Sequence, residues 1–184
     1  MPTKKIAFTL MIFTVLLSGL TTAGAADNIY VTVTGAIQGS FRGEVPRAGF
    51  ENKTFRGLSF DYEVANPRDP QSGMLTGKRV HKPLTLKKSW GPASLQLFSA
   101  LTQNEVLTVV IDFFMIHRSG KLMLDHTIKL NNAFVTSFHS HADTDNLQTP
   151  QTETIELVFQ SIEIIDHPSQ ATAVDNSLGT PPGR

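Results

Sequence analysis

The sequence predicts a mainly β protein, folded as a compact antiparallel β-barrel or two-sheet sandwich with one flanking α-helix. Residues 28–166 consist largely of short stretches that alternate apolar and polar side chains and are rich in β-branched and aromatic residues. The breaks between them are short and contain Gly, Pro, Ser or Asn, which favours antiparallel connections. Residues 92–104 alone show a convincing helical period. Together these observations indicate about seven or eight strands around one core, with the helix to one side.

The first half of the chain contains three expected strands. In residues 28–41, Ile29, Val31 and Val33 share one face, and glycines follow as turn or bulge positions. Residues 55–64 alternate in the same way and form the second strand. Residues 80–90 form the third, and Pro83 inside it indicates an edge position or a bulge.

The expected helix follows the break at Gly91-Pro92 and ends near Asn104. Leu95, Phe98 and Leu101 recur at three-residue steps, with Leu97 and Ala100 beside them. Those residues form one apolar stripe about three turns long, which we expect to face the core.

The second half predicts further hairpins. Residues 105–117 are apolar and β-branched, and Ser119-Gly120 turns the chain into the next strand. Asn131-Asn132 marks another turn, and residues 153–165 alternate cleanly up to a strand end near Asp166. Residues 167–184 are poor in bulky apolar side chains, and we expect them to be a disordered tail.

Residues 1–26 have the three parts of a secretory signal peptide, which leaves residues 27–166 as the folded domain. Lys4 and Lys5 precede the uncharged apolar run Ile6–Leu20, and Ala23 and Ala25 provide small residues for cleavage. The run is shorter than the roughly 20 residues that a transmembrane helix needs. We therefore expect a secreted or periplasmic protein with no membrane association after cleavage.

Composition excludes several classes of function. Removal of Lys4 and Lys5 reduces the 16 basic residues to 14 against 16 acidic ones, a net charge of about −2, which argues against general affinity for nucleic acid or anionic lipid. The absence of cysteine excludes thiol catalysis, iron–sulfur clusters and cysteine-based zinc sites. We expect no cofactor.

One pair of histidines has the spacing of a metal site. His139 and His141 share one face of a strand and precede Asp143 and Asp145, a pattern that could bind zinc or copper. No third ligand is fixed by spacing, so a polar strand end is the favoured interpretation.

A catalytic triad can be sketched around the Ser119-Gly120 hairpin. Its candidate members are His117, His126, Asp112, Asp125 and Ser119. No nucleophile elbow or oxyanion hole accompanies them, so the sequence predicts no enzymatic activity.

The densest positive charge comprises Lys78, Arg79, His81, Lys82, Lys87 and Lys88. We interpret Lys87 and Lys88 as protection of an edge strand or as one side of an oligomer interface with acidic partners. Trp90 is expected to anchor the underside of the helix.

Residues 65–77 form a long excursion between two strands. Pro67 and Pro70 remove backbone donors, so the segment should be exposed. Loops of this length in compact domains are usually functional or disordered.

Four segments in order resemble the Hcp family, the tube proteins of bacterial type VI secretion. They are IYVTVTGAIQGSFRGEV, GKRVHKPLTLKKSW, SLQLFSALTQNEVLTVVIDFF, and HTIKLNNAFVTSFHSH together with ETIELVFQSIEI. The resemblance covers residues 28–165. It implies a β-barrel with one flanking helix and no catalytic residue. It also implies rings of six copies that stack into a tube with a lumen for small effectors.

The resemblance further implies that the 65–77 excursion is the family's extended loop, which reaches toward a neighbouring ring. Its assembly residues would be Asn66, Pro67, Arg68, Asp69, Pro70, Gln71, Ser72, Gly73 and Met74. Other copies of the chain would be the main partner, with spike, sheath or effector proteins as further partners.

The leader is the one departure from the family, whose tube subunits lack a signal peptide. Either the chain is an Hcp-like protein that works outside the cytoplasm, or the leader has a role other than export. Two alternatives to a ring-forming protein also stay open. One is a monomeric extracellular module that binds a surface glycan or protein, and the other is a metal-dependent activity at His139 and His141.

Overall fold

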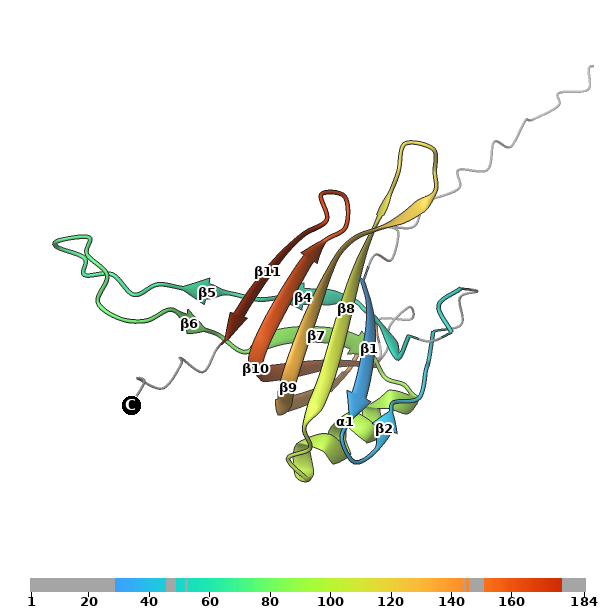
Figure 1. The fold of residues 1–184 in the computed structure, drawn as a ribbon. Coiled ribbons are helices and arrows are strands. Elements are labelled where there is room, and N and C mark those ends of the chain that lie inside the picture. The colour runs from blue at the N-terminus through green and yellow to red at the C-terminus, as the bar shows by residue number, and fades with distance from the viewer. Residues whose placement is uncertain (1–28, 46–48, 52, 144, 146–150, 177–184) are drawn as a thin grey trace, which may run out of the picture.

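The computed structural model describes residues 29–45, 49–51, 53–143, 145 and 151–176 (Figure 1). Within them the chain is mainly β with one short helix, as predicted. The elements are β1 (Ile29–Gly35), β2 (Gly39–Ser40), β3 (Phe55–Gly57), β4 (Ser59–Asp61), β5 (Val64–Ala65), β6 (Val80–His81), β7 (Leu84–Ser89), α1 (Pro92–Thr102), β8 (Leu107–Ile116), β9 (Leu122–Ala142), β10 (Gln151–Asp166) and β11 (Ala171–Asn176). The predicted leader at residues 1–26 lies outside the described residues.

A single antiparallel sheet forms the body of the described chain and folds back on itself. Its strand order is β2-β1-β8-β9-β10-β7-β4, while β3 pairs with β1 and β11 pairs with β10. Only Leu58 separates β3 from β4, so residues 55–61 join the β1 end of the sheet to the β7 end. The backbone N–H of Leu58 adds a hydrogen bond of 2.7 Å to the carbonyl of Lys87. Residues 55–64, predicted as one strand, are therefore divided among three short strands, of which β3 and β4 close the barrel and β5 pairs with β6 in a separate sheet.

Helix α1 closes one end of the barrel (Figure 1). Its buried apolar residues are Ala93, Leu97 and Ala100, which pack into the core cluster with strands on both sides of the barrel. The predicted core-facing stripe is right for Leu97 and Ala100, whereas Leu95 and Phe98 are 65% and 52% exposed and do not face the core. Two apolar stripes run along this helix, and the period alone does not distinguish which one the barrel accepts.

Strand β9 continues through Asn131-Asn132, where the sequence predicted a turn. Asn132 has a φ of 48°, and the pairing steps from Leu107↔Ala133 to Val109↔Leu130. One extra residue on β9 is therefore accommodated as a β-bulge. The bulge bends β9, and this bend contributes to the curvature with which the sheet closes into a barrel.

Residues 171–176 form strand β11, so the prediction of disorder is wrong for this part of the tail. All six residues pair with Ser161–Asp166 of β10. This strand carries few bulky apolar side chains and gains its order from backbone hydrogen bonds to an otherwise free edge of β10. Residues 177–184 lie outside the described residues. In the described part of the chain, no helix has the length and hydropathy required to cross a membrane.

Candidate assembly surface

The predicted loop at residues 65–77 belongs to a projecting β-arm, defined here as residues 62–82 (Figure 1). Strands β5 and β6 pair with each other, and an isolated bridge joins Arg68 to Leu75. At the tip, the carboxylate of Asp69 accepts backbone hydrogen bonds from Gln71 at 2.7 Å and Ser72 at 3.3 Å. The arm is therefore an ordered hairpin.

Apolar side chains on the arm are left in contact with solvent. Met74 is 70% exposed and Leu75 is 60% exposed, and both lie near the tip. Val64 and Val80 are also exposed, closer to the barrel. Exposed apolar side chains of this kind make the arm a candidate contact surface.

The arm leaves the barrel at Lys82-Pro83, where the sequence predicted a continuous strand. Pairing between β7 and β10 stops at Leu84↔Leu157. Pro83 has no backbone N–H to extend this ladder. Lys82 instead donates its N–H to the carbonyl of Glu63, 3.0 Å away on the other side of the arm. A single proline thus decides where the sheet ends and the arm begins.

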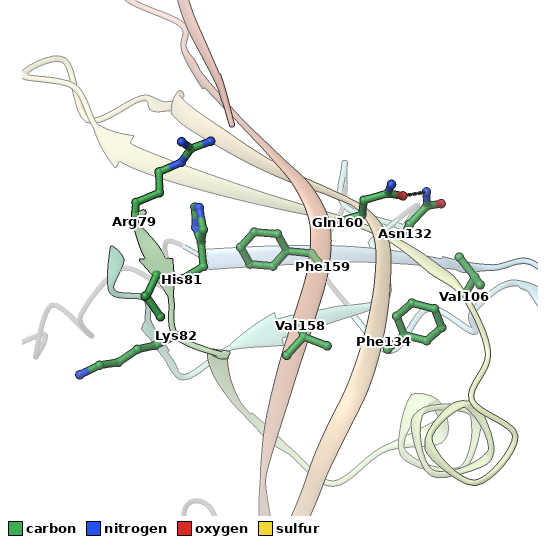
Figure 2. Close-up of a pocket in the computed structure, with 10 residues that line it drawn as sticks. Arg79, His81, Lys82, Val106, Asn132, Phe134, Val158, Phe159 and Gln160 are labelled. Atoms are coloured by element: carbon green, nitrogen blue, oxygen red, sulfur yellow. Dashed lines mark hydrogen bonds between the residues drawn. The ribbon is translucent and has the colours of Figure 1, made fainter. Parts of the chain in front are cut away.

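A groove of about 800 Å³ lies between the base of the arm and the barrel (Figure 2). One wall is Arg79–Lys82, and the other comes from β9, β10 and the residue before β8. The barrel side presents Phe134, Val158 and Val106 (Figure 2). At its rim, the Asn132 side-chain amide donates to the Gln160 Oε1 at 2.5 Å. The groove is an apolar surface with a polar rim.

Four polar side chains gather at the base of the arm. The Tyr62 hydroxyl lies 2.6 Å from Nδ1 of His81, and Nε2 of His81 lies 3.2 Å from a carboxylate oxygen of Asp175. Arg79 donates two hydrogen bonds to the same carboxylate. Burial, and then the nearby Arg79 charge, lowers the pKa of His81. The lowered pKa favours a neutral His81, whose Nδ1 can accept from the Tyr62 hydroxyl, while Nε2 faces the Asp175 carboxylate without hydrogen-bond geometry.

A second exposed apolar surface lies on α1. Leu95 and Phe98 face solvent, and the ring of Phe98 packs edge-on against Phe138 at a centroid distance of 5.9 Å. Trp90 is 48% exposed, so the prediction that it anchors the underside of the helix is wrong. The arm and the helix therefore present two different candidate contact surfaces. A head-to-tail assembly requires such a pair.

The predicted basic cluster does not form one surface. Arg79 and His81 bind Asp175, whereas Lys88 is fully buried on β7. Strand β7 lies between β4 and β10, so the interpretation of Lys87 and Lys88 as edge-strand lysines is wrong, and the buried Lys88 is not an interface lysine either. Its ammonium group pairs with Glu44 at 2.8 Å and Glu153 at 3.3 Å.

The predicted triad residues are not brought together. His117 contacts Ser119 at 3.1 Å, and His126 contacts Asp125 at 2.8 Å. Asp112 instead binds Lys53 at 2.5 Å and the Thr127 hydroxyl at 2.7 Å. The sequence could not separate these pairs, because all of the residues lie on or near one hairpin.

His139 and His141 both lie exposed on β9, opposite Thr154 and Thr152 of β10. In the described ranges there is no group of three or more His, Cys, Asp or Glu side chains placed to hold a metal ion.

Comparison with known proteins identifies the family of the chain. The family model "Type VI secretion system effector, Hcp" matches residues 30–165. The chain is 31% identical over 151 residues to the "Major exported protein" of Pseudomonas aeruginosa, which covers 74% of this chain and 87% of that protein. A solved structure described as Hcp protein superposes with a TM-score of 0.78 at 22% identity, over 84% of this chain and all of the other. The secreted protein Hcp3 from Pseudomonas aeruginosa gives a TM-score of 0.66 at 22% identity, over 80% and 98%. The chain therefore belongs to the Hcp family, the non-enzymatic tube proteins of the type VI secretion system.

Proposed function

We propose that this chain assembles into closed rings of about six copies, that the rings stack into a tube, and that the arm docks on a copy in the neighbouring ring. The observation that carries the proposal is the arm itself, an ordered hairpin that projects from the barrel and ends in exposed apolar side chains (Figure 1). The residues that make this contact are 66–74, with Met74 at its centre. Spike, sheath and effector proteins are the further partners of such a tube.

The energetics favour a docked arm. Complete burial of a side chain such as Met74 or Leu75 contributes about 1.5–3 kcal/mol. The hairpin is already ordered by its bridge and by the Asp69 turn, so docking loses little further backbone entropy. The contact is repeated around a ring, and the contributions of single arms therefore add across the stacked interface.

The proposal is tested on residues 27–184 by sedimentation velocity and electron microscopy. We expect rings and stacked rings from the unaltered chain. The double variant Met74→Ser/Leu75→Ser should retain rings but lose stacking. Met123→Ser is the matched control, because Met123 is also an exposed methionine but lies on β9, away from the arm.

A chain that stays monomeric at high concentration would contradict the ring and would favour the monomeric extracellular binding module. Rings that stack equally well without the arm's apolar side chains would contradict the docking role of the arm.

We also propose that the protein is exported. The similar proteins described as exported and secreted support this, as does the predicted leader at residues 1–26. Full-length protein made in a Gram-negative host should appear outside the cytoplasm with the mass of a chain beginning at Ala26 or Asp27. Cytoplasmic protein that retains its first residues would contradict export by this leader.

A further inference from the structure

We propose that Asp175 on β11 is a positioning residue that sets the direction of the arm. The orientation of the arm is measurable on a single protomer, so the positioning role of Asp175 stands without ring assembly. Only its consequence for stacking rests on the proposed function.

The arm leaves the barrel at a gap between two strands that pair with the same edge of β10. Strand β7 pairs with β10 as far as Leu157, and β11 pairs with the same side of β10 from Ser161 onward. Residues 158–160 lie between these two partners. These residues and Arg79–Lys82 line opposite walls of the groove (Figure 2). The base of the arm therefore passes between β7 and β11.

Strand β11 holds the arm at this exit by polar contacts. Arg79 donates two hydrogen bonds to the Asp175 carboxylate and a third, of 3.2 Å, to the carbonyl of Asn176. Nε2 of His81 faces the same carboxylate at 3.2 Å. The planar guanidinium donates through two of its three nitrogens, Nε and Nη2, and this fixes its direction as well as its distance, which a single contact would not.

A cluster of three aromatic rings also packs the base of the arm against the barrel. The rings of Tyr62, His81 and Phe159 lie 5.6–6.2 Å apart, and Phe159 belongs to β10. Tyr62 and His81 come from the two sides of the arm, so the group links both sides to the barrel.

The arm has little else to define its direction. Strands β5 and β6 pair with each other, and the described sheet contains no strand of the barrel paired with either. A hairpin tied at its base is free to pivot unless the base is held. Asp175, 96 residues from Arg79 and on the last described strand, binds Arg79 and so restrains the base of the arm.

The chain has no cysteine, so a pair of spin labels can be placed without background. Ser72→Cys at the arm tip and Ser140→Cys on β9 are both at exposed positions. Pulsed electron paramagnetic resonance then gives the distance distribution between tip and barrel. Labelled chains are diluted into a large excess of unlabelled ones, so that only distances within one protomer are recorded.

We expect a narrow distribution in the otherwise unaltered chain and one about twice as wide after Asp175→Asn, since a half-exposed ion pair shifts such an equilibrium severalfold. The exchanged pair Arg79→Asp/Asp175→Arg should restore the narrow distribution. Glu163→Gln is the matched control, because the Glu163 carboxylate pairs with Lys129 of β9 and not with Arg79 or His81 of the arm. It should leave the distribution unchanged.

An unchanged distribution in Asp175→Asn would overturn the proposal, and so would a failure of the exchanged pair to narrow it. A broadened distribution with unchanged ring stacking would support the positioning role and contradict the docking role of the arm. The two proposals therefore fail separately.

Discussion

At the scale of single residues, Lys88 is a fully buried charged side chain whose ammonium group is held by a polar network. Its ammonium group contacts two carboxylates, the Ser94 hydroxyl at 3.1 Å and the carbonyl of Ser89 at 2.7 Å. Ser94 lies in the first turn of α1 and donates in turn to Glu153 at 2.8 Å. Gly91 permits this arrangement, since a Cβ there would lie 1.9 Å from the Glu44 carboxylate. One network thus joins β7, β10 and the start of the helix.

Replacement of Lys88 by Met should lower the free energy of unfolding by about 3 kcal/mol, because it leaves Glu153 buried without its cation. The double variant Lys88→Met/Glu153→Met should recover at least half of this loss. Urea denaturation followed by circular dichroism measures both. Lys87→Met, the adjacent lysine on the more exposed face of β7, should change stability by less than about 0.5 kcal/mol. Equal losses at both lysines would contradict the role of the network.

Glu105 is a second buried carboxylate with a structural role. Burial alone raises its pKa, but hydrogen bonds from the Gln38 side chain and from the backbone N–H groups of Gln38 and Ile37 outweigh burial and lower the pKa below its ordinary 4.5. These bonds, 2.6–2.7 Å long, hold the β1–β2 turn against the segment that follows α1. Gly35 leaves the necessary space, because a Cβ there would lie 2.3 Å from the carboxylate.

Because the pKa of Glu105 is lower in the folded chain, its carboxylate stabilises the folded state at pH values above the ordinary pKa. This contribution is lost as the pH falls through the lower pKa of the folded state. Glu105→Gln should therefore cost about 2 kcal/mol near neutral pH, and the difference from the unaltered chain should shrink below about pH 4. Urea denaturation across this pH range provides the measurement, with the exposed Glu63→Gln as the control. A difference that stays constant with pH would show that the carboxylate charge is not involved.

At the scale of elements, α1 has a buried apolar face and an exposed one. Leu97 is 2% exposed and packs in the core, whereas Leu95, two residues earlier, faces solvent. The moderate amphipathicity that results is typical of a helix that both closes a core and offers a contact surface.

This asymmetry is testable with two identical substitutions. Leu97→Ala should lower the free energy of unfolding by about 3 kcal/mol through the cavity it leaves, and Leu95→Ala by less than about 0.5 kcal/mol. Thermal and urea denaturation of the two variants compare them directly. Similar losses would mean that Leu95 is buried in solution, and would place a partner or a second copy on this face.

The strands show which boundaries are readable from a local pattern. The hairpin at Ser119-Gly120 and the cleanly alternating β10 are as predicted, because each depends on neighbours in sequence. Other boundaries depend on the strand that pairs with the segment in the folded chain. They are the breaks at Leu58 and Pro83, the bulge at Asn132 and the ordering of β11. Periodicity carries no information about that neighbour.

At the scale of the whole molecule, a tightly packed barrel carries a thin projecting arm. Val31, Ile111 and Leu130 are completely buried, while the arm is exposed from residue 63 to residue 80 except at the half-buried Asp69. Local stability should therefore differ strongly between the two parts.

Hydrogen exchange read by mass spectrometry should show the slowest amides in β1, β8 and β9 and the fastest in residues 66–78 of the dissociated protomer. If the arm docks on another copy, its exchange should slow by at least about tenfold on assembly, whereas the barrel amides change little. Dissociated protomer at low concentration is the reference. An arm that exchanges equally fast in rings and in protomers would contradict docking.

The mainly β class, the position of the helix, the exposed excursion before Pro83 and the family resemblance are readable from the sequence, because each depends on local periodicity or on short motifs. The buried lysine, the covered face of α1 and the contact of Asp175 with Arg79, 96 positions away, are visible only in the folded chain. Burial and ion pairing depend on the residues that lie across the barrel. Closure of the sheet by residues 55–61 determines that arrangement, and no stretch of sequence encodes it alone.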